Sequence, residues 1–285
     1  MELIYRIKKP ETIKRFMTEN NIPTSILQKD EKNYKIFVNN EIKSRKDTIR
    51  KGDKIHFLLD EEGLNKFKPQ DLEIEVVYED EYLLIVNKPA DMLLMPSKAN
   101  PENTLGNFLV GYYQKNNISS MIHYVNRIDR EAQGLVVIAK HRFVKFLLSN
   151  KIDNELVFNY KTIVSGKMDT KEFEICLPIA KKEGTYLREV VEVGEDCSTK
   201  YRVEKEFKNF SLLDISVKGK LPHQIRVHLA YFNYPIVGDK LYNKEDYPTK
   251  LLLLCYKTNF IHPITEKEIN ITLDLTQDFT DFIKK

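Results

Sequence analysis

The sequence has few of the residues that build nucleotide-cofactor, metal or disulfide sites. It holds ten glycines in 285 residues, and neither a GxGxxG nor a GxxxxGK[ST] pattern occurs; those glycine-rich loops bind nucleotide phosphates. Its three cysteines, Cys176, Cys197 and Cys255, lie far apart and form no CxxC pair. We therefore predict no nucleotide cofactor, no metal centre and a reducing compartment such as the cytoplasm.

Long hydrophobic runs are also missing. The longest, Leu251 to Cys255, is far shorter than the roughly 20 residues that a membrane-spanning helix needs. Met1 to Tyr5 does not begin a signal peptide. With 42% hydrophobic and 31% charged residues, the composition predicts a soluble, cytoplasmic globular protein with no membrane partner.

The net charge of +3 is too small to indicate nucleic-acid binding by itself, so the position of the charges matters more. Through Arg50 the chain carries twelve Lys and Arg against seven Asp and Glu. The patterns there predict a helix over 11–20, a strand and Asn-Asn turn over 35–42, and a turn and strand over 52–58. Two interpretations stay open: a solvated basic surface, or a small RNA-binding domain whose lysines contact phosphates.

Residues 64–70 form the expected linker, which divides the chain into domains 1–70 and 71–285. Beyond it we predict strands at 72–76, 83–86, 135–139 and 157–164, helices starting at Thr104 and over 143–148, and a hairpin over 201–217 that turns at Lys208-Asn209. Mixed helices and adjacent strands predict an α+β fold with a mainly antiparallel mixed sheet, flanking helices and a small N-terminal α+β domain.

Asp129 lies in the segment from Val125 to Leu135, just before a strand that begins near Gly134. A lone aspartate there is most often a turn-forming residue. A loop at the end of a rigid strand is, however, a common position for a catalytic group. The position alone does not decide between these two interpretations.

Besides the segment around Asp129, a second unusual segment runs from Gly219 to Leu229. Arg226 stands among apolar neighbours and needs a carboxylate partner. The pair could be a structural salt bridge. If the partner is Asp129, the arginine would also keep this carboxylate ionised. On an extended segment Gln224 would share a face with Arg226. The spacing of five between His223 and His228 argues against chelation, so a packing or hydrogen-bonding role is expected for His223.

Tyr160 alternates with Phe158 and Thr162 on one face of a predicted strand. A core tyrosine is the ordinary interpretation. The functional one is an aromatic face that holds an unstacked base.

Together these segments resemble the RluA/RluD-type family of RNA pseudouridine synthases over nearly the whole chain. The segment from Asn126 to Gly134 resembles the family's HRLDxxTSG sequence with its catalytic aspartate, and Tyr160 matches the active-site tyrosine. The other matching segments are 80–90, 223–229, 235–242 and His262-Pro263. The first seventy residues resemble the small RNA-binding module of the ribosomal-protein S-four type.

The resemblance implies a pseudouridine synthase fold and isomerisation of uridine to pseudouridine, without a cofactor or metal. It implies Asp129, Tyr160 and Arg226 as catalytic residues. It also implies contacts to RNA from four further side chains: Arg127, Lys220, His223 and Gln224. Lys220 is expected at a phosphate. Ribosomal RNA is the favoured partner, transfer RNA stays open, and a monomer is the simplest expectation.

The sequence departs from the family at several positions around these residues. Asn126 replaces a histidine, and Ala132-Gln133 replaces Thr-Ser; Asp91 stands for glycine and Met95 for a frequent histidine. The segment Lys220-Leu221-Pro222 replaces Arg-Thr and is one residue longer. Ala132-Gln133 and the altered Lys220 segment support an alternative function, a non-catalytic RNA-binding or ribosome-assembly factor on a decayed synthase scaffold, whereas the presence of Asp129, Tyr160 and Arg226 argues against it. A glycosidase is less favoured, because Glu131 is poorly spaced as a second carboxylate.

Overall fold

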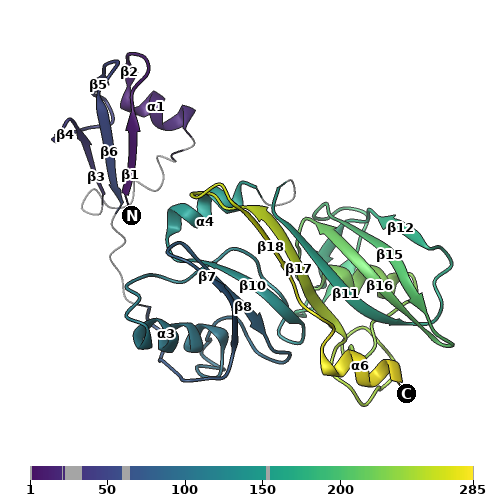
Figure 1. The fold of residues 1–285 in the computed structure, drawn as a ribbon. Coiled ribbons are helices and arrows are strands. Elements are labelled where there is room, and N and C mark those ends of the chain that lie inside the picture. The colour runs from purple at the N-terminus through teal and green to yellow at the C-terminus, as the bar shows by residue number, and fades with distance from the viewer. Residues whose placement is uncertain (1, 21, 23–33, 60–64, 152–154, 285) are drawn as a thin grey trace.

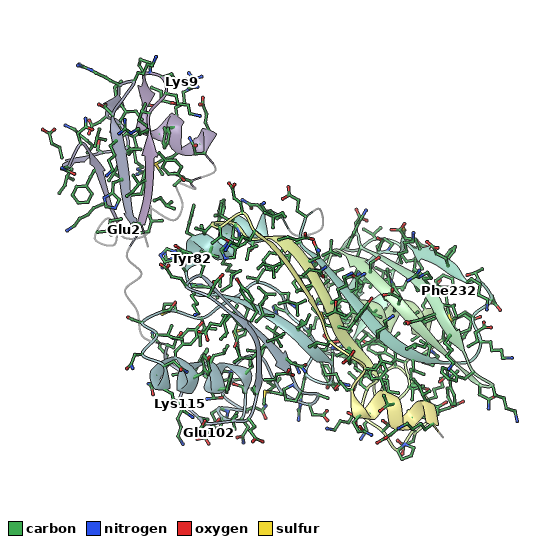
Figure 2. The ribbon with its side chains drawn as sticks, viewed as in Figure 1. Glu2, Lys9, Tyr82, Glu102, Lys115 and Phe232 are labelled. Atoms are coloured by element: carbon green, nitrogen blue, oxygen red, sulfur yellow. The ribbon has the colours of Figure 1, made fainter. Side chains whose placement is uncertain are left out.

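The computed structural model describes residues 2–20, 22, 34–59, 65–151 and 155–284. Its strands form two main groups, a four-stranded N-terminal sheet and a ten-stranded sheet that runs through the rest of the chain (Figure 1). Helices accompany both groups, so the predicted α+β class is confirmed. Figure 2 shows the two groups with their side chains.

The N-terminal group is a small antiparallel sheet with one helix. Its elements are β1 (Glu2–Arg6), β2 (Glu11–Thr12), α1 (Ile13–Glu19), β3 (Tyr34–Val38), β4 (Glu41–Lys43), β5 (Thr48–Ile49) and β6 (Lys54–Leu59). The sheet order is β1-β6-β3-β4. Asn39 and Asn40 have positive φ angles of 50° and 72°, the left-handed pair that a tight two-residue hairpin requires. The predicted Asn-Asn turn is therefore confirmed.

The helix α1 closes one face of this sheet. Phe16, on α1, stacks on Phe57 of β6 with ring centroids 6.4 Å apart, and Ile13 and Met17 are fully buried beside it. This apolar set gives the first region a core of its own. Phe143, from the region of the large sheet, also joins that core.

The large sheet has the strand order β12-β15-β16-β11-β17-β10-β8-β7, with β18 beside β17 and β9 beside β10. Its strands are β7 (Glu75–Glu79), β8 (Leu83–Lys88), β9 (His123–Tyr124), β10 (Gln133–Ala139), β11 (Val157–Ser165), β12 (Glu172–Ile175), β15 (Ser198–Glu206), β16 (Phe210–Lys218), β17 (Leu253–Ile261) and β18 (Glu268–Thr272). A separate pair comprises β13 (Ile179–Lys181) and β14 (Arg188–Val190). The predicted hairpin is β15–β16.

All neighbours in the large sheet are antiparallel except β10 and β17, which confirms a mainly antiparallel mixed sheet. The parallel contact is short and pairs Gln133 with Leu254 and Gly134 with Cys255. A Cβ atom on Gly134 would lie 2.2 Å from the carbonyl oxygen of Cys255, and its φ angle is +111°. Only glycine fits there.

Four helices flank the sheet: α3 (Leu105–Lys115), α4 (Arg142–Ser149), α5 (Gln224–Tyr231) and α6 (Gln277–Lys284). Thr104 begins α3 as predicted. Its hydroxyl accepts a hydrogen bond from the backbone of Asn107, and the Asn107 side chain accepts one from the Thr104 backbone. This reciprocal capping satisfies two otherwise unpaired N–H groups.

One expectation is wrong. The segment that carries Arg226 is not extended but forms α5 after a tight loop. Every residue from Gln224 to Leu229 is buried, so the segment shows no polar face and no helical periodicity by which the sequence could reveal it. Gly219, Lys220 and His223 all have positive φ angles, and they form the loop that leads into the helix.

The expected linker at 64–70 begins outside the described residues, and its described part packs on the region of the large sheet. Asn65 donates a hydrogen bond to the carbonyl of Ser120, and Asn107 of α3 donates one to the carbonyl of Lys68. The division at residue 70 stays a prediction, but Asn65 to Gln70 already contact the large region.

Candidate active site

The loop that carries Asp129 joins β9 to β10 and is held from both sides. Asn126 donates a hydrogen bond to the carbonyl of Leu135 at 3.0 Å and accepts one from the backbone of Val137 at 2.8 Å. Its buried amide therefore has a structural role at the position where the family usually has histidine. Gly134 fixes the other end of the loop through its close contact with β17.

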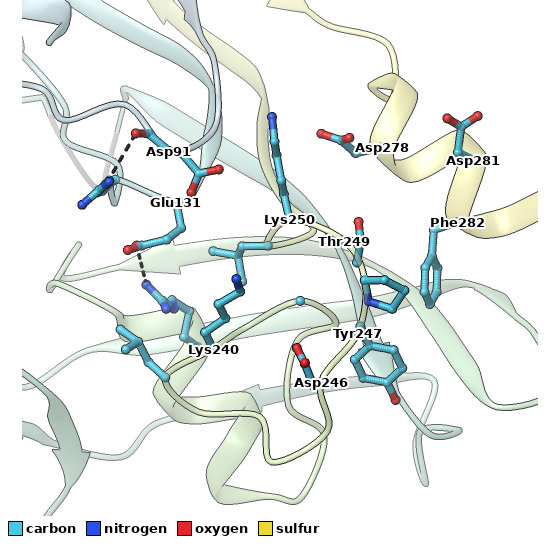
Figure 3. Close-up of a pocket in the computed structure, with 16 residues that line it drawn as sticks. Asp91, Glu131, Lys240, Asp246, Tyr247, Thr249, Lys250, Asp278, Asp281 and Phe282 are labelled. Atoms are coloured by element: carbon cyan, nitrogen blue, oxygen red, sulfur yellow. Dashed lines mark hydrogen bonds and ion pairs between the residues drawn. The ribbon is translucent and has the colours of Figure 1, made fainter. Parts of the chain in front are cut away.

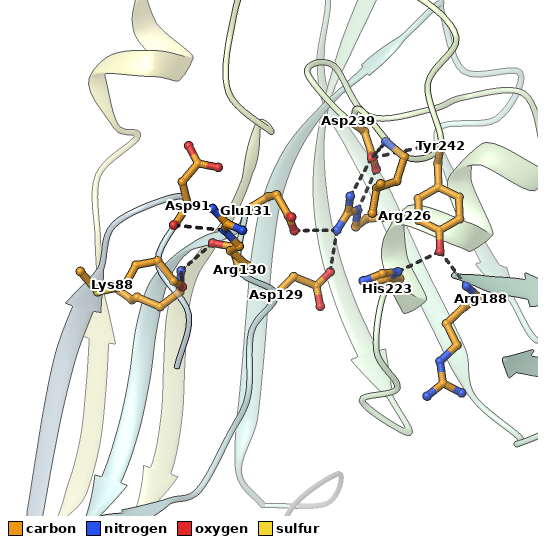
Figure 4. A network of polar contacts seen from close by, with 12 residues as sticks. Lys88, Asp91, Asp129, Arg130, Glu131, Arg188, His223, Arg226, Asp239 and Tyr242 are labelled. Atoms are coloured by element: carbon orange, nitrogen blue, oxygen red, sulfur yellow. Dashed lines mark hydrogen bonds and ion pairs between the residues drawn. The ribbon is translucent and has the colours of Figure 1, made fainter. Parts of the chain in front are cut away.

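Lys88, at the end of β8, holds the same loop through hydrogen bonds to backbone carbonyls. Its ammonium donates to the carbonyls of Pro89, Met92 and Arg130 at 2.8, 2.9 and 3.0 Å, and its side chain is fully buried. Burial lowers the pKa of Lys88 to about 7, while the carboxylates of Glu131 and Asp129 act in the opposite direction. A basic group inside the protein thus connects β8 to the backbone next to Asp129 (Figure 4).

Arg226 binds three carboxylates (Figure 4). Its Nε and Nη2 donate to both oxygens of Asp239 at 2.8 and 2.7 Å. Its Nη1 lies 3.2 Å from Asp129 and 3.1 Å from Glu131. Arg226 and Asp239 are almost completely buried, whereas the side chain of Asp129 is 20% exposed. The guanidinium is therefore fixed in direction by Asp239 and presents one nitrogen to Asp129.

The charges of this cluster decide which groups stay ionised. The hydrogen bonds and charge of Asp239, with the charges of Asp129 and Glu131, raise the pKa of Arg226 above its ordinary value, although burial acts in the opposite direction. Arg226 is therefore a permanent cation. Asp129 shares this cation with Asp239 and Glu131.

His223 precedes α5 and contacts the same cluster through Tyr242. Its Nδ1 lies 2.8 Å from the Tyr242 hydroxyl, which also accepts a hydrogen bond from the backbone of Arg188. The Tyr242 ring packs 5.4 Å from the Arg226 guanidinium. Besides accepting from Arg188, the hydroxyl has its own proton and a second lone pair, so it can donate to His223 Nδ1 or accept from it according to the tautomer of the ring. Burial lowers the pKa of His223, which favours a neutral ring.

Tyr160 and Asp129 line one small pocket of about 50 Å³. Tyr160 lies on β11 directly across from Cys255 of β17 and is 7% exposed. Burial, followed by the neighbouring Cys255 thiol, raises the pKa of Tyr160 well above its ordinary value. The pocket therefore presents a neutral phenol and a carboxylate, as expected for a site that holds an aromatic base.

The remaining predicted contact residues also border this pocket. Arg127 is exposed. Gln224 uses its amide within the protein: it accepts from Leu221 and donates to the carbonyls of Ser198 and Lys218. This bonding indicates that Gln224 positions the loop before α5. The ammonium of Lys220 is buried and lies 4.8 Å from the centre of the Phe158 ring.

A second, larger cavity of about 950 Å³ adjoins the pocket, and Arg226 borders both. Figure 3 shows Lys240 and Lys250 in this cavity together with acidic side chains from the Asp129 loop and from α6. These acids include Glu131, Asp278 and Asp281. The larger volume therefore has mixed charge, and the chemistry indicated by Asp129 and Tyr160 belongs to the smaller pocket.

Within the described ranges, no group of three or more His, Cys, Asp or Glu side chains is arranged to hold a metal ion. No helix in the same ranges is long and apolar enough to cross a membrane. The arrangement that is present, a carboxylate on a cation beside an aromatic ring, can attack or deprotonate a bound sugar.

Sequence reasoning anticipated the pair of Arg226 and Asp129 but missed Asp239 as the main partner of the arginine. It also missed the loop support from Lys88 and the shared contact of Glu131. The apolar surroundings of Arg226 indicated that a carboxylate was needed. Nothing in the spacing showed that two more acids would share it.

Comparison with known families matches residues 82–231 to the RNA pseudouridylate synthase family. The uncharacterized RNA pseudouridine synthase YhcT of Bacillus subtilis is 31% identical over 242 residues, or 82% of this chain and 79% of that protein. The ribosomal large subunit pseudouridine synthase D of Escherichia coli is 30% identical over 223 residues, or 76% of this chain and 67% of that protein.

A solved structure described as human RNA pseudouridylate synthase domain containing 4 has the same fold. Its TM-score is 0.60 at 17% sequence identity, and the match covers 73% of this chain and 91% of that one. The family match lies over the Asp129 loop, β11 and α5, where the geometry places the pocket. The chain therefore belongs to the RNA pseudouridylate synthase family and is an RNA pseudouridine synthase, an isomerase.

Proposed function

We propose that Asp129 is the catalytic carboxylate with which this enzyme isomerises specific uridines, and that its target is ribosomal RNA. The contact between Asp129 and buried Arg226 at 3.2 Å carries the first part of this proposal. A carboxylate that is partly exposed and fixed in direction can begin cleavage of the bond between ribose and uracil. It does so either by attacking C1′ or by taking a proton from the ribose.

Arg226 acts through Asp129 in this scheme. Its bidentate contact with Asp239 prevents the guanidinium from turning, so the remaining nitrogen holds the attacking oxygen in one place. Fixed geometry of this kind can account for several orders of magnitude in rate.

Tyr160 stacks on the uracil in our proposal. Because its raised pKa keeps it neutral, it is a poor base for the final proton on C5. Tyr160 can assist only as a relay, in which its oxygen accepts the C5 proton while its own proton passes along a hydrogen bond to another acceptor. The base must leave its stack to reach this pocket, which costs a few kcal/mol and favours single-stranded or weakly paired targets.

We infer the RNA contacts outside the pocket from the position and charge of each side chain. Arg127 is exposed at the pocket rim and is available to the RNA backbone. His223, fixed by Tyr242, borders the same pocket. Gln224 acts indirectly, because it orders the loop that carries Lys220 and His223.

The first seventy residues form, in our proposal, an RNA-binding module of the ribosomal-protein S-four type. Their basic excess suits a large structured RNA. Ribosomal RNA is favoured because relatives at about 30% identity are named ribosomal large subunit pseudouridine synthase D.

The test uses total RNA labelled with tritium at uracil C5, taken from a strain that lacks this protein. Purified wild type is expected to release tritium and Asp129→Asn is expected to release none, while both bind RNA and melt alike. Asp71→Asn changes a carboxylate whose side chain is 88% exposed and serves as the matched control with full release.

Separating the labelled RNA into ribosomal and transfer fractions tests the target. Release from ribosomal RNA alone supports the proposal, whereas release from transfer RNA alone contradicts it. Substantial activity of Asp129→Asn would contradict the assignment of the carboxylate.

A further inference from the structure

Lys220 was expected at an RNA phosphate, yet the structure places its ammonium inside the protein. The Nζ atom is buried and lies 4.8 Å from the centre of the Phe158 ring. Phe158 is itself a core residue, 2% exposed. A phosphate on the surface cannot reach a nitrogen in this position, so any part of the RNA that contacts it has to enter the pocket.

The position of this ammonium relative to the catalytic pair is set by the sheet. Phe158 and Tyr160 lie on the same strand, β11, and the charge of Lys220 acts on the thiol of Cys255, which pairs with Tyr160 across the sheet. Lys220 and Asp129 both border the pocket. Lys220 therefore borders the same pocket as the carboxylate and the phenol.

The pocket that would receive the base is small, with a volume of about 50 Å³. Lys220, Leu221 and His223 form one side of it, and they belong to a loop with three left-handed residues. Lys220 therefore belongs to one wall of the space that the base would occupy.

We propose that Lys220 is a further catalytic residue that contacts a carbonyl oxygen of the uracil. When the C1′–N1 bond breaks, its electron pair goes to N1, and the free uracil becomes an anion with charge on O2 and O4. This holds whether Asp129 attacks C1′ or takes a ribose proton. The ammonium keeps its proton and stabilises the anion while the ring turns. C5 then bonds to C1′, as the Asp129–C1′ bond breaks in the first route or as Asp129 returns the ribose proton in the second. The C5 proton leaves to water, and N1 takes up a proton from water.

The inference rests on the proposed function, since it assigns a role in the same reaction. A fixed cation at a developing anion in a closed site makes one of the largest contributions to enzyme catalysis, and removing such a donor costs about 10²- to 10³-fold in rate. A phosphate contact has a different signature: weaker RNA binding and a shallower salt dependence, with little effect on the chemical step.

The experiment compares Lys220→Met, Lys220→Arg and wild type. Single-turnover tritium release is measured on C5-labelled RNA from a strain lacking the protein, and the salt dependence of binding is measured with a uridine-rich 20-nucleotide RNA. We expect Lys220→Met to lower the single-turnover rate about 100-fold with an unchanged salt slope, and Lys220→Arg to recover part of that rate. The control Lys218→Met removes an exposed lysine at the end of β16, just before the same loop.

A lower affinity with a slope reduced by about one, and an unchanged rate, would make Lys220 a phosphate contact and overturn the proposal. So would a rate that does not change at all. Thermal melting identifies a variant that fails to fold, in which case Lys220→Arg and its rate decide the question. Inactive wild type is a failure of the proposed function, whereas active wild type with an equally active Lys220→Met is a failure of this inference alone.

Discussion

The catalytic loop and the N-terminal sheet both carry many charged side chains, but the two regions differ in how far these side chains are exposed to solvent. Around Asp129 one buried cation serves several acids: Arg226 is 1% exposed and contacts three carboxylates. On the N-terminal sheet the basic side chains of Arg50, Lys51 and Lys54 are exposed. Single changes should therefore have large effects in the first region and small, additive effects in the second.

The largest effect is expected from Arg226→Met. It leaves the fully buried Asp239 without its partner, and breaking a buried ion pair in this way costs about 3–5 kcal/mol of unfolding free energy. Urea unfolding measures the loss. Arg202→Met is the control, because Arg202 is 67% exposed in its pair with Asp214 and such pairs contribute about 0–1 kcal/mol.

Arg226→Lys separates the contribution of the charge of Arg226 from that of its geometry. It keeps the charge but loses the planar fork that contacts Asp239 with two nitrogens and Asp129 with the third. We expect much of the stability to return while turnover stays at least tenfold low, as measured by tritium release. Full activity with lysine would mean that charge alone positions Asp129.

An intermediate effect is expected from Lys88→Met, and it depends on pH. The folded pKa of about 7 lies below the ordinary 10.5, so between these values the unfolded chain binds a proton that the folded chain lacks. Stability then rises with pH over this interval, and the cost of burying charged Lys88 is fully present only below pH 7.

The measurement is the unfolding free energy of wild type and Lys88→Met from pH 6 to 10. Other titrating groups cancel in the difference, so the stability of wild type relative to Lys88→Met should rise as the pH increases. Parallel curves would show that the three carbonyl contacts keep Lys88 protonated throughout.

The smallest effect is expected from Arg50→Gln with Lys51→Gln, two exposed changes in the turn before β6. If the N-terminal module binds RNA, affinity should fall several-fold and the salt slope by about two, with an unchanged single-turnover rate. Lys43→Gln is the control, because Lys43 already pairs with Glu41 at 2.8 Å. An unchanged slope would remove the module from the binding surface.

The sequence predicted the elements that have a clear pattern of apolar residues or a recognisable capping residue. Alternating or continuous apolar residues identified β8, β10 and β11, and Thr104 identified the start of α3 through its capping chemistry. The same logic failed at α5, because a helix buried on every side shows no polar face.

In the candidate site, the local sequence indicated that Arg226 needs a carboxylate, but the choice among acids is made by the tertiary structure. Asp129, Glu131 and Asp239 reach the guanidinium from two different segments. Likewise, the buried position of Lys220 depends on a loop conformation with three positive φ angles, which spacing along the chain does not reveal.

The contact between Gly134 and Cys255 limits how this enzyme can change. A side chain at 134 would meet a carbonyl at 2.2 Å, whereas Arg127 is exposed in a loop at the pocket rim, so its side chain can be exchanged without moving the sheet. A library that randomises position 134 should yield one functional amino acid. One that randomises the pocket rim can yield new RNA preferences, because the carboxylate keeps its place while its surroundings vary.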